Sequence, residues 1–341
     1  MTDVERQWTA LTETVGLYED LSRSVWSVDG AKALDALQGL LTNDLRAAQE
    51  GQAIPCLALT PKGRPITDLR VWKRSAREGS ALLDLSVEGA DELLKHFGRY
   101  LPPRFATIVP LPEAKILRVL GPLADSALLS AFGTDLELPT GDRFVQTRLE
   151  AASGVDLEGH TGAPILLGRP ESEGGGWDIL LPAQHPAVEE TLLEAVESAG
   201  GRAVGPEAWD IWRVERGIPE FGRDFGLENL VQETGLTERT VSFEKGCFTG
   251  QEVVARIHYR GHVNQRLMGL QAPGDEPPPL AAELFREEKA SGRITSPVHS
   301  PRFGSIALGM IRREVDPGTF LSVSPAAKPD IMVLTLPFTS P

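Results

Sequence analysis

The residue best suited to do chemistry is Cys247, which follows Lys245 and Gly246 in the segment 241–266. A helix is predicted to begin a few residues later, so the thiol would lie just ahead of a helix N-terminus. The partial positive charge of that terminus, together with the ammonium group of Lys245, favours the reactive thiolate over the thiol. A small buried apolar side chain is the alternative for a lone cysteine, and the local sequence favours neither.

The helix after the cysteine is predicted from Thr249 and Glu252, whose spacing is that of a capping box. We expect it to begin at Gly250 and to end near Arg260. Gly261 would then follow in the left-handed conformation that stops many helices.

Basic residues gather in this segment, although the chain carries a formal net charge of -14. Arg256 and Arg260 would share one face of the helix, where their planar guanidinium groups could bind a carboxylate or a phosphate. A solvated helix face is the alternative. His258 and His262 have the spacing of a metal-binding pair, but the helix is expected to end before the second of them. We therefore predict no metal site.

A second candidate is Glu215, which falls in the last turn of a helix predicted for 206–217. An exposed anion there opposes the helix dipole by about 0.3–1 kcal/mol, and such a breach of a local rule hints at function. The two carboxylate oxygens would match the adjacent amino and ring N–H donors of a pterin. Pairing with Arg213 or Arg216 is the alternative.

Helices and strands of mixed order must position these residues. A short strand at 56–59, a turn rich in proline and glycine, and an alternating strand at 66–72 predict a hairpin. We expect a first α+β unit over 1–112, a second over 113–262 that loosely repeats the first, and a small all-β domain over 263–341.

Composition excludes several classes of protein. With 341 residues, of which 41% are apolar, the chain can bury the cores of two or three folding units, and no stretch is apolar enough to span a membrane. We expect a cytoplasmic protein without a membrane partner. The excess of 48 acidic over 34 basic residues argues against a direct nucleic-acid partner. Cys56 and Cys247 alone cannot supply the roughly four thiolates of an iron-sulfur cluster.

The segment Lys245-Gly-Cys-Phe-Thr-Gly-Gln-Glu252 resembles the signature of YgfZ-type proteins, in which lysine, glycine and cysteine precede an aromatic residue, any residue, glycine, glutamine and glutamate. Other blocks look like those of the wider superfamily of the glycine cleavage system T protein. They are Leu37-Gln-Gly-Leu-Leu-Thr-Asn-Asp44, Pro61-Lys-Gly-Arg64, Arg213-Val-Glu-Arg-Gly-Ile-Pro219, and Gly292-Arg-Ile-Thr-Ser296 with Ser300-Pro301. The cysteine motif is specific to the YgfZ branch, whereas the other blocks indicate only the superfamily.

The resemblance implies an α+β fold, a T-protein-like cloverleaf of two interleaved ferredoxin-like units with a C-terminal β-barrel. The implied ligand is tetrahydrofolate or a one-carbon derivative. Glu215 looks like the pterin-binding glutamate, and Cys247, beside Lys245, looks like the functional cysteine of the branch. Arg223 or Arg256 could hold the glutamate tail of the folate. The implied role is support of iron-sulfur proteins, including certain tRNA-modifying enzymes, with iron-sulfur client or assembly proteins as partners.

One departure concerns the strand that carries Asp68. T proteins that transfer an aminomethyl group have paired aspartates where this chain has Ile66-Thr67-Asp68-Leu69. Because the hydroxyl of Thr67 cannot supply the negative charge that would stabilise an iminium-like intermediate, aminomethyl transfer is not expected. The resemblance to the YgfZ branch likewise implies no well-defined turnover reaction. Asp68 could still contact the ligand, or it could cap or pair at the hairpin. A folate-dependent one-carbon transferase and a passive folate carrier are the alternative functions.

Overall fold

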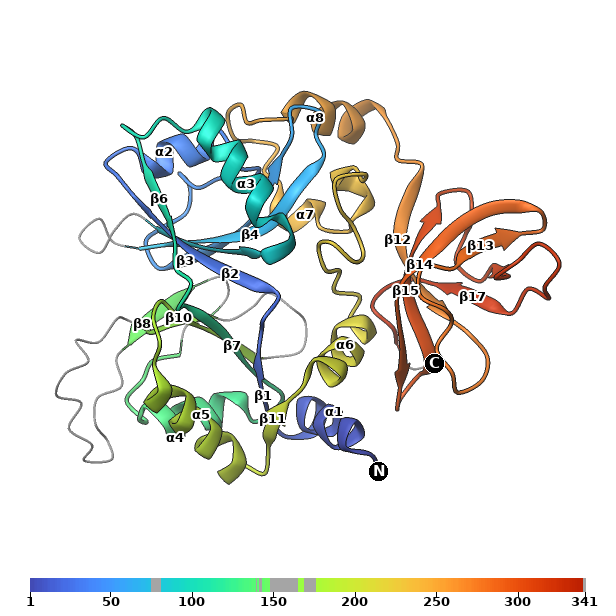
Figure 1. Ribbon diagram of the computed structural model, residues 1–341, viewed down its shortest axis with the longest axis horizontal. Coiled ribbons are helices and arrows are strands. Elements are labelled where there is room, and N and C mark those ends of the chain that lie inside the picture. Colours follow the sequence, from blue (N-terminus) through green and yellow to red (C-terminus); the bar gives the residue numbers. More distant parts are fainter. Residues whose placement is uncertain (75–80, 139, 141–142, 148–164, 169–175, 340–341) are drawn as a thin grey trace. The chain divides into compact units, whose positions relative to one another are not determined.

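The computed structural model describes residues 1–74, 81–138, 140, 143–147, 165–168 and 176–339. Helices and strands alternate along the chain, which confirms a mixed α+β fold (Figure 1). Two compact units are present. One comprises Met1–Cys56 and Asp68–Trp209, and the other comprises Leu57–Thr67 and Asp210–Pro341. The tip of one hairpin therefore belongs to the C-terminal unit, and the domain limits expected from the sequence stay predictions.

A five-stranded sheet carries the hairpin and Asp68. Its strand order is β3-β4-β5-β2-β6, and the strands are β2 (Arg23–Asp29), β3 (Gln52–Leu59), β4 (Pro65–Lys73), β5 (Ala81–Ser86) and β6 (Thr107–Pro110). The N–H of Thr60 donates to the carbonyl of Arg64 at 2.9 Å, which closes the predicted hairpin between β3 and β4. Helix α3 (Val87–Tyr100) packs against β5 and β2, and the short α2 (Ala33–Gln38) precedes β3.

A second, six-stranded sheet has the order β11-β1-β7-β10-β9-β8. Its strands are β1 (Gly16–Glu19), β7 (Lys115–Leu120), β8 (Phe144–Thr147), β9 (Ile165–Gly168), β10 (Gly176–Leu181) and β11 (Arg202–Val204). Strand β1 pairs parallel with β11 and antiparallel with β7. Since β1 directly precedes β2 in the chain, the two α+β halves are interleaved.

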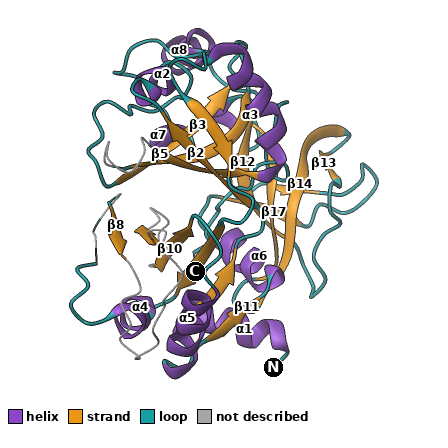
Figure 2. Ribbon diagram, turned by 60° about the vertical axis from the view of Figure 1, so that its left-hand side comes forward, coloured by secondary structure: helices purple, strands orange, loops and turns teal. Residues whose placement is uncertain are grey.

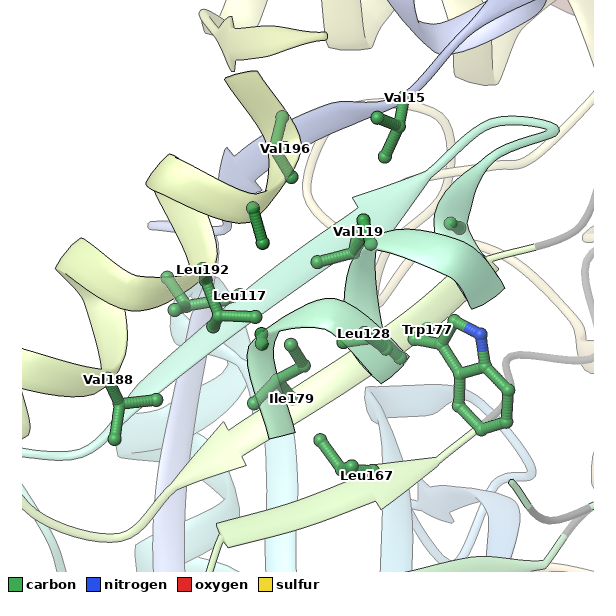
Figure 3. Close-up of a cluster of buried hydrophobic side chains, with 14 of the residues drawn as sticks. Val15, Leu117, Val119, Leu128, Leu167, Trp177, Ile179, Val188, Leu192 and Val196 are labelled. Carbon is green, nitrogen blue, oxygen red and sulfur yellow. The ribbon is translucent and has the colours of Figure 1, made fainter. Parts of the chain in front are cut away.

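Three helices cover the second sheet. Helices α4 (Ala124–Phe132) and α5 (Pro186–Ser198) lie side by side against it, and α1 (Asp3–Glu13) packs against β1 and β11 (Figure 2). Alternate residues of β7 and β10 point to α4 and α5. Figure 3 shows them, among them Leu117, Val119, Trp177 and Ile179, packed against Leu128, Val188, Leu192 and Val196. Full burial of each such aliphatic side chain contributes about 1.5–3 kcal/mol to folding.

The opposite faces of β7 and β10 pack on the first sheet. Apolar side chains fill part of this layer, with Val25, Trp72 and Leu82 from one sheet and Ile116, Phe144 and Leu180 from the other. Between these positions, β7 and β10 present Arg118 and Asp178 instead of apolar side chains. Both charged groups lie in the interior of the N-terminal unit.

A six-stranded sheet forms the C-terminal domain, in the order β13-β14-β15-β12-β17-β16. Its strands are β12 (Gln265–Gln271), β13 (Glu283–Arg286), β14 (Lys289–Ser300), β15 (Gly304–Arg312), β16 (Phe320–Leu321) and β17 (Ile331–Leu334). The backbones of Phe285 and Ser322 exchange hydrogen bonds of 2.8 and 2.9 Å, which link the two edges. The predicted C-terminal β-barrel is confirmed as a nearly closed sheet.

Short helices join the α+β halves to the barrel. They are α6 (Pro206–Glu215), the 3-10 helix η1 (Val231–Glu233), α7 (Thr237–Thr240) and α8 (Gln251–Arg260). A core cluster anchors this segment, and it includes Leu57 and Leu59 of β3 together with Phe225, Phe248 and Val254. None of the helices in the described part of the chain combines the length and the apolar character that a bilayer crossing requires.

Candidate functional site

Glu215 is the last residue of α6, and its side chain is only 3% exposed. Its Oε1 accepts a hydrogen bond of 2.6 Å from the Oγ of Ser300, at the end of β14. The same Oγ accepts hydrogen bonds from the backbone N–H groups of Arg302 and Phe303, at 3.0 and 2.9 Å. Ser300 therefore fixes the turn between β14 and β15 and the carboxylate of Glu215 at once.

The backbone after Glu215 is held by a Schellman motif. The N–H of Gly217 donates to the carbonyl of Val214, and the N–H of Ile218 donates to the carbonyl of Arg213, both at 2.9 Å. Gly217 has a φ of +67°, and a Cβ added there would lie 2.8 Å from the Cβ of Leu336. Only glycine fits this position, so the sequence correctly predicts the stop at Gly217.

Arg216 places a cation beside Glu215. Its Nη1 lies 3.9 Å from Glu215 Oε2, and its guanidinium carbon lies 4.0 Å from the centroid of the Trp212 ring. Burial lowers the pKa of Arg216 to about 10, an effect that Glu215 opposes and Arg302 reinforces. The expected alternative, an ion pair of Glu215 with a neighbouring arginine, is therefore present, with 3.9 Å between the charged atoms of Arg216 and Glu215.

Arg213 pairs elsewhere. It is 1% exposed and donates to Asp210, Asp224 and the Oγ of Ser296, in each case at 2.8 Å. Burial acts to lower the pKa of Arg213, but Asp224 and Asp210 outweigh it and hold the pKa above its usual value. Because Ser296 Oγ also donates to Asp224, this cluster joins α6 to β14 of the barrel.

The two arginines expected to hold a folate tail differ in their surroundings. Arg223 is exposed, and its Nη1 donates to Asp210 at 2.7 Å and to Glu220 at 3.1 Å. Burial raises the pKa of Glu220 despite the nearby arginines. Arg256 lies exposed on α8. Arg223 would have to exchange these carboxylates for a ligand, and the role of either arginine stays a prediction.

Cys247 is exposed, so the alternative of a small buried filler does not apply to it. The other cysteine, Cys56, is buried. Lys245 is buried, with its Nζ 5.3 Å from the centroid of the Phe248 ring. Phe248 belongs to the core cluster of this segment. The motif is therefore anchored by its lysine and its aromatic residue, and the thiol is left accessible.

The helix after the cysteine corrects two expectations. Helix α8 covers Gln251–Arg260, close to the predicted limits, but Gly250 is its N-cap and makes no side-chain capping bond. The φ of +82° at Gly250 moves Thr249 out of the capping position, so the predicted capping box is wrong. Gly261 is extended, with a φ of -123°, and is not a left-handed stop.

Asp68 lies on β4 in the N-terminal unit, and its side chain is 29% exposed. Its Oδ2 accepts a hydrogen bond of 2.5 Å from Nη1 of Arg23, on β2. Arg23 also donates to Asp84 on β5, through Nη2 to Oδ1 at 2.6 Å and to the backbone carbonyl at 2.9 Å. Asp68 is thus paired, as one of the alternatives expected. The neighbouring Thr67 is fully buried.

Asp68 ends a chain of alternating buried charges between the two sheets of the N-terminal unit, which we call the ion chain. Arg70 donates to Asp84 at 2.9 Å and also to Asp178. Arg118 donates to Asp178 at 3.1 Å and to Asp20 at 2.6 Å. In order, the members of the ion chain are Asp68, Arg23, Asp84, Arg70, Asp178, Arg118 and Asp20.

Two aspartates of the ion chain, Asp84 and Asp20, have pKa values lowered by their partners. Burial acts to raise the pKa of Asp84, but Arg70, Arg23 and the Trp72 N–H bring it down to about 2. The pKa of Asp20 is lowered in the same way, by Arg118 and the Ser22 hydroxyl against the effect of burial. Sequence reasoning missed this chain, although a charged residue inside an apolar strand, such as Arg118, is the signal that could have indicated it.

Within the described residues, no group of three or more histidine, cysteine or acidic side chains could hold a metal ion. Glu215, Arg223, Cys247 and Arg256 belong to the C-terminal unit, and Asp68 belongs to the N-terminal unit.

Comparison with known proteins gives this arrangement a context. The GCVT N-terminal domain family matches residues 1–245. The chain belongs to this family. An aminomethyltransferase of Thermotoga neapolitana is 25% identical over 334 residues, which cover 96% of this chain and 87% of the relative. A protein of Yersinia enterocolitica named tRNA-modifying protein YgfZ is 27% identical over 264 residues, which cover 76% of this chain and 71% of the relative.

The fold comparison agrees with the family. The crystal structure of the glycine cleavage system aminomethyltransferase T from Bartonella henselae matches with a TM-score of 0.82 and 21% identity, over 98% of this chain and 89% of that one. This member of the GCVT family therefore has the T-protein-like fold expected from its sequence blocks. The resemblance to YgfZ-type proteins and T proteins is confirmed as a relationship.

Proposed function

We propose that this chain binds tetrahydrofolate or a one-carbon derivative and supports the assembly or repair of iron-sulfur proteins in the cytoplasm. The observation that carries the proposal is the exposed Cys247 in a complete lysine-glycine-cysteine motif, in a chain of the T-protein-like family. A relative named as tRNA-modifying protein YgfZ supports this branch, and relatives named as aminomethyltransferases support the second candidate below.

The surroundings of Glu215 support folate as the ligand. Ser300 fixes the carboxylate before any ligand arrives, and the hydrogen bond from the Gly217 N–H to the Val214 carbonyl holds the backbone beside it. A pre-organised group loses less conformational entropy on binding. Carboxylate oxygens accept two parallel hydrogen bonds, which suits the amino and ring N–H donors of a pterin. Arg216 places a positive charge 3.9 Å from Oε2 of this acid.

Cys247 would act on a client. An exposed thiol can carry sulfur or redox chemistry or contact a cluster on another protein, and iron-sulfur clusters are held by about four thiolates. Because Cys56 is buried, Cys247 is the thiol of this chain that a client can reach, and the client or small thiols must complete the ligand shell.

Genetic complementation tests this role. Loss of the gene should lower the activities of several iron-sulfur enzymes, and Cys247→Ser should fail to restore them. Cys56→Ser is the matched control, because it removes the buried thiol and should restore the activities. Full rescue by Cys247→Ser, with folate binding intact, would instead indicate a passive folate carrier.

A folate-dependent aminomethyltransferase is the second candidate, favoured by relatives of that name and by the presence of Asp68. Thr67 stands against it because a hydroxyl supplies no charge for an iminium-like intermediate. Purified protein with a lipoylated carrier protein, ammonia and methylenetetrahydrofolate should show no turnover. Turnover that Asp68→Asn abolishes would establish the transferase.

A further inference from the structure

We infer that Arg23 is a positioning residue, which sets the direction of the Asp68 carboxylate toward a bound reduced folate. This inference rests on the proposed folate function and adds a residue to it. It comes from the hydrogen bonds at the Asp68 end of the ion chain and from the difference between the two ends of that chain.

The guanidinium of Arg23 cannot turn freely. Its Nε and Nη2 donate to Oδ1 of Asp84, at 3.2 and 2.6 Å, and Nη2 also reaches the Asp84 carbonyl at 2.9 Å. Asp84 is fully buried and is itself fixed by Arg70 and by the indole N–H of Trp72. The planar group is therefore locked in place, and one edge, Nη1, remains for Asp68.

Arg23 is charged under all working conditions. Burial acts to lower its pKa, but the carboxylates of Asp68 and Asp84 outweigh burial and hold the pKa above its usual value. The positive charge is thus permanent as well as fixed in space. A carboxylate that accepts a 2.5 Å hydrogen bond from such a donor has one preferred orientation.

The two ends of the ion chain differ. Asp20 is buried at one end, and besides Arg118 it accepts hydrogen bonds from the hydroxyl and the N–H of Ser22, at 2.6 and 3.1 Å. Asp68 is 29% exposed at the other end. Of the two end members of the ion chain, Asp68 is the one that a ligand can reach, whereas Asp20 is enclosed by Ser22 and Arg118.

Binding of 5-formyltetrahydrofolate, a stable reduced folate, to the full chain tests the inference by calorimetry. We expect Asp68→Asn to weaken binding about 10- to 100-fold, as for loss of a hydrogen bond to a charged group. Arg23→Lys keeps the charge but loses the fork, so we expect a loss of about 10-fold. Arg118→Lys is the matched control at the enclosed end of the ion chain, and its affinity should stay within about twofold of the parent.

Two further variants separate positioning from a general structural role. If Arg23 acts through Asp68, the double variant Arg23→Lys with Asp68→Asn should bind as weakly as Asp68→Asn alone, and no more weakly. Asp68→Glu leaves Arg23 untouched and displaces the carboxylate by one methylene, so it should also weaken binding about 10-fold. This variant changes a partly exposed site, so its melting temperature should match that of the parent.

Three results would overturn the inference. They are an equal loss of affinity in Arg23→Lys and Arg118→Lys, an additional loss from Arg23→Lys in the Asp68→Asn background, and parent-like affinity of Asp68→Glu. A parent protein that binds no reduced folate would instead refute the proposed function itself, before any variant is compared.

Discussion

Ser300→Ala removes the one hydroxyl that fixes Glu215 and the β14–β15 turn together. The hydrogen bond to the carboxylate is 2.6 Å long, and both residues are buried, so its loss should cost about 1.5–3 kcal/mol of unfolding free energy. The turn also loses its two N–H acceptor contacts, each worth about 0.5–1.5 kcal/mol. Urea unfolding should measure the sum, and calorimetry should show reduced-folate binding weakened about 10-fold.

Ser291→Ala is the matched control for this experiment. Ser291 is equally buried on the same strand, but its Oγ donates to a backbone carbonyl, that of Lys289, at 2.9 Å. A neutral hydrogen bond of this kind is worth about 0.5–1.5 kcal/mol, and folate binding should not change. If Ser300→Ala and Ser291→Ala cost the same and neither alters folate affinity, Ser300 is only a turn residue and our account of Glu215 fails.

Three other predictions concern a glycine, a thiol and a histidine. Gly217→Ala should lower the unfolding free energy by at least about 1 kcal/mol in urea titrations, because of the φ of +67° and the approach of Leu336; no loss would contradict the assigned geometry. Native protein treated with iodoacetamide should gain a single adduct by mass spectrometry, at the exposed Cys247 and not at the buried Cys56. Burial lowers the pKa of His96, so the unfolded chain takes up its proton first and stability should fall as the pH drops below about 6.5. His96→Gln should flatten that decline in urea midpoints measured at several pH values, and an unchanged decline would assign it to other groups.

Local features of the sequence could be predicted where one short segment determines them. The alternating strand and the turn between β3 and β4 needed only proline, glycine and a period of two. The stop of α6 at Gly217 likewise needed one glycine after an apolar helix. The predicted capping box was wrong for a reason that is also local. The left-handed backbone of Gly250 makes this glycine, and not Thr249, the N-cap of α8.

Features formed by distant segments could not be predicted in this way. Arg70 and Asp178 are 108 positions apart, and Arg118 and Asp20 are 98 apart, so their pairing depends on sheet order and register. No short segment of the sequence indicates that β1 joins the sheet of β7 while the next strand, β2, joins the other sheet. The hydrogen bond from Ser300 to Glu215 spans 85 positions and depends on how the barrel meets α6.

The ion chain determines how the strands that carry it align, more than it adds to the free energy of unfolding. Burial acts to lower the pKa of Arg23, Arg70 and Arg118, and in each case the flanking aspartates reverse the effect. Buried ion pairs of this kind are often replaceable by apolar residues without loss, whereas removal of one partner costs about 3–5 kcal/mol. Misalignment of the members of the ion chain therefore costs more folding free energy than their correct pairing contributes.

This penalty bears directly on Asp68. Arg70 joins β4 to Asp178 on β10 of the other sheet, and Asp68 lies two residues before Arg70 on the same face of β4. A shift of β4 by two residues would keep that face inward but would place Asp68 where Arg70 now stands, beside Asp84 and Asp178. Asp68 would then bring a third carboxylate to Asp84 and Asp178, in place of the Arg70 cation that these two aspartates share. The ion chain thus excludes this register, and it fixes Asp68 at the one position where Arg23 can orient it.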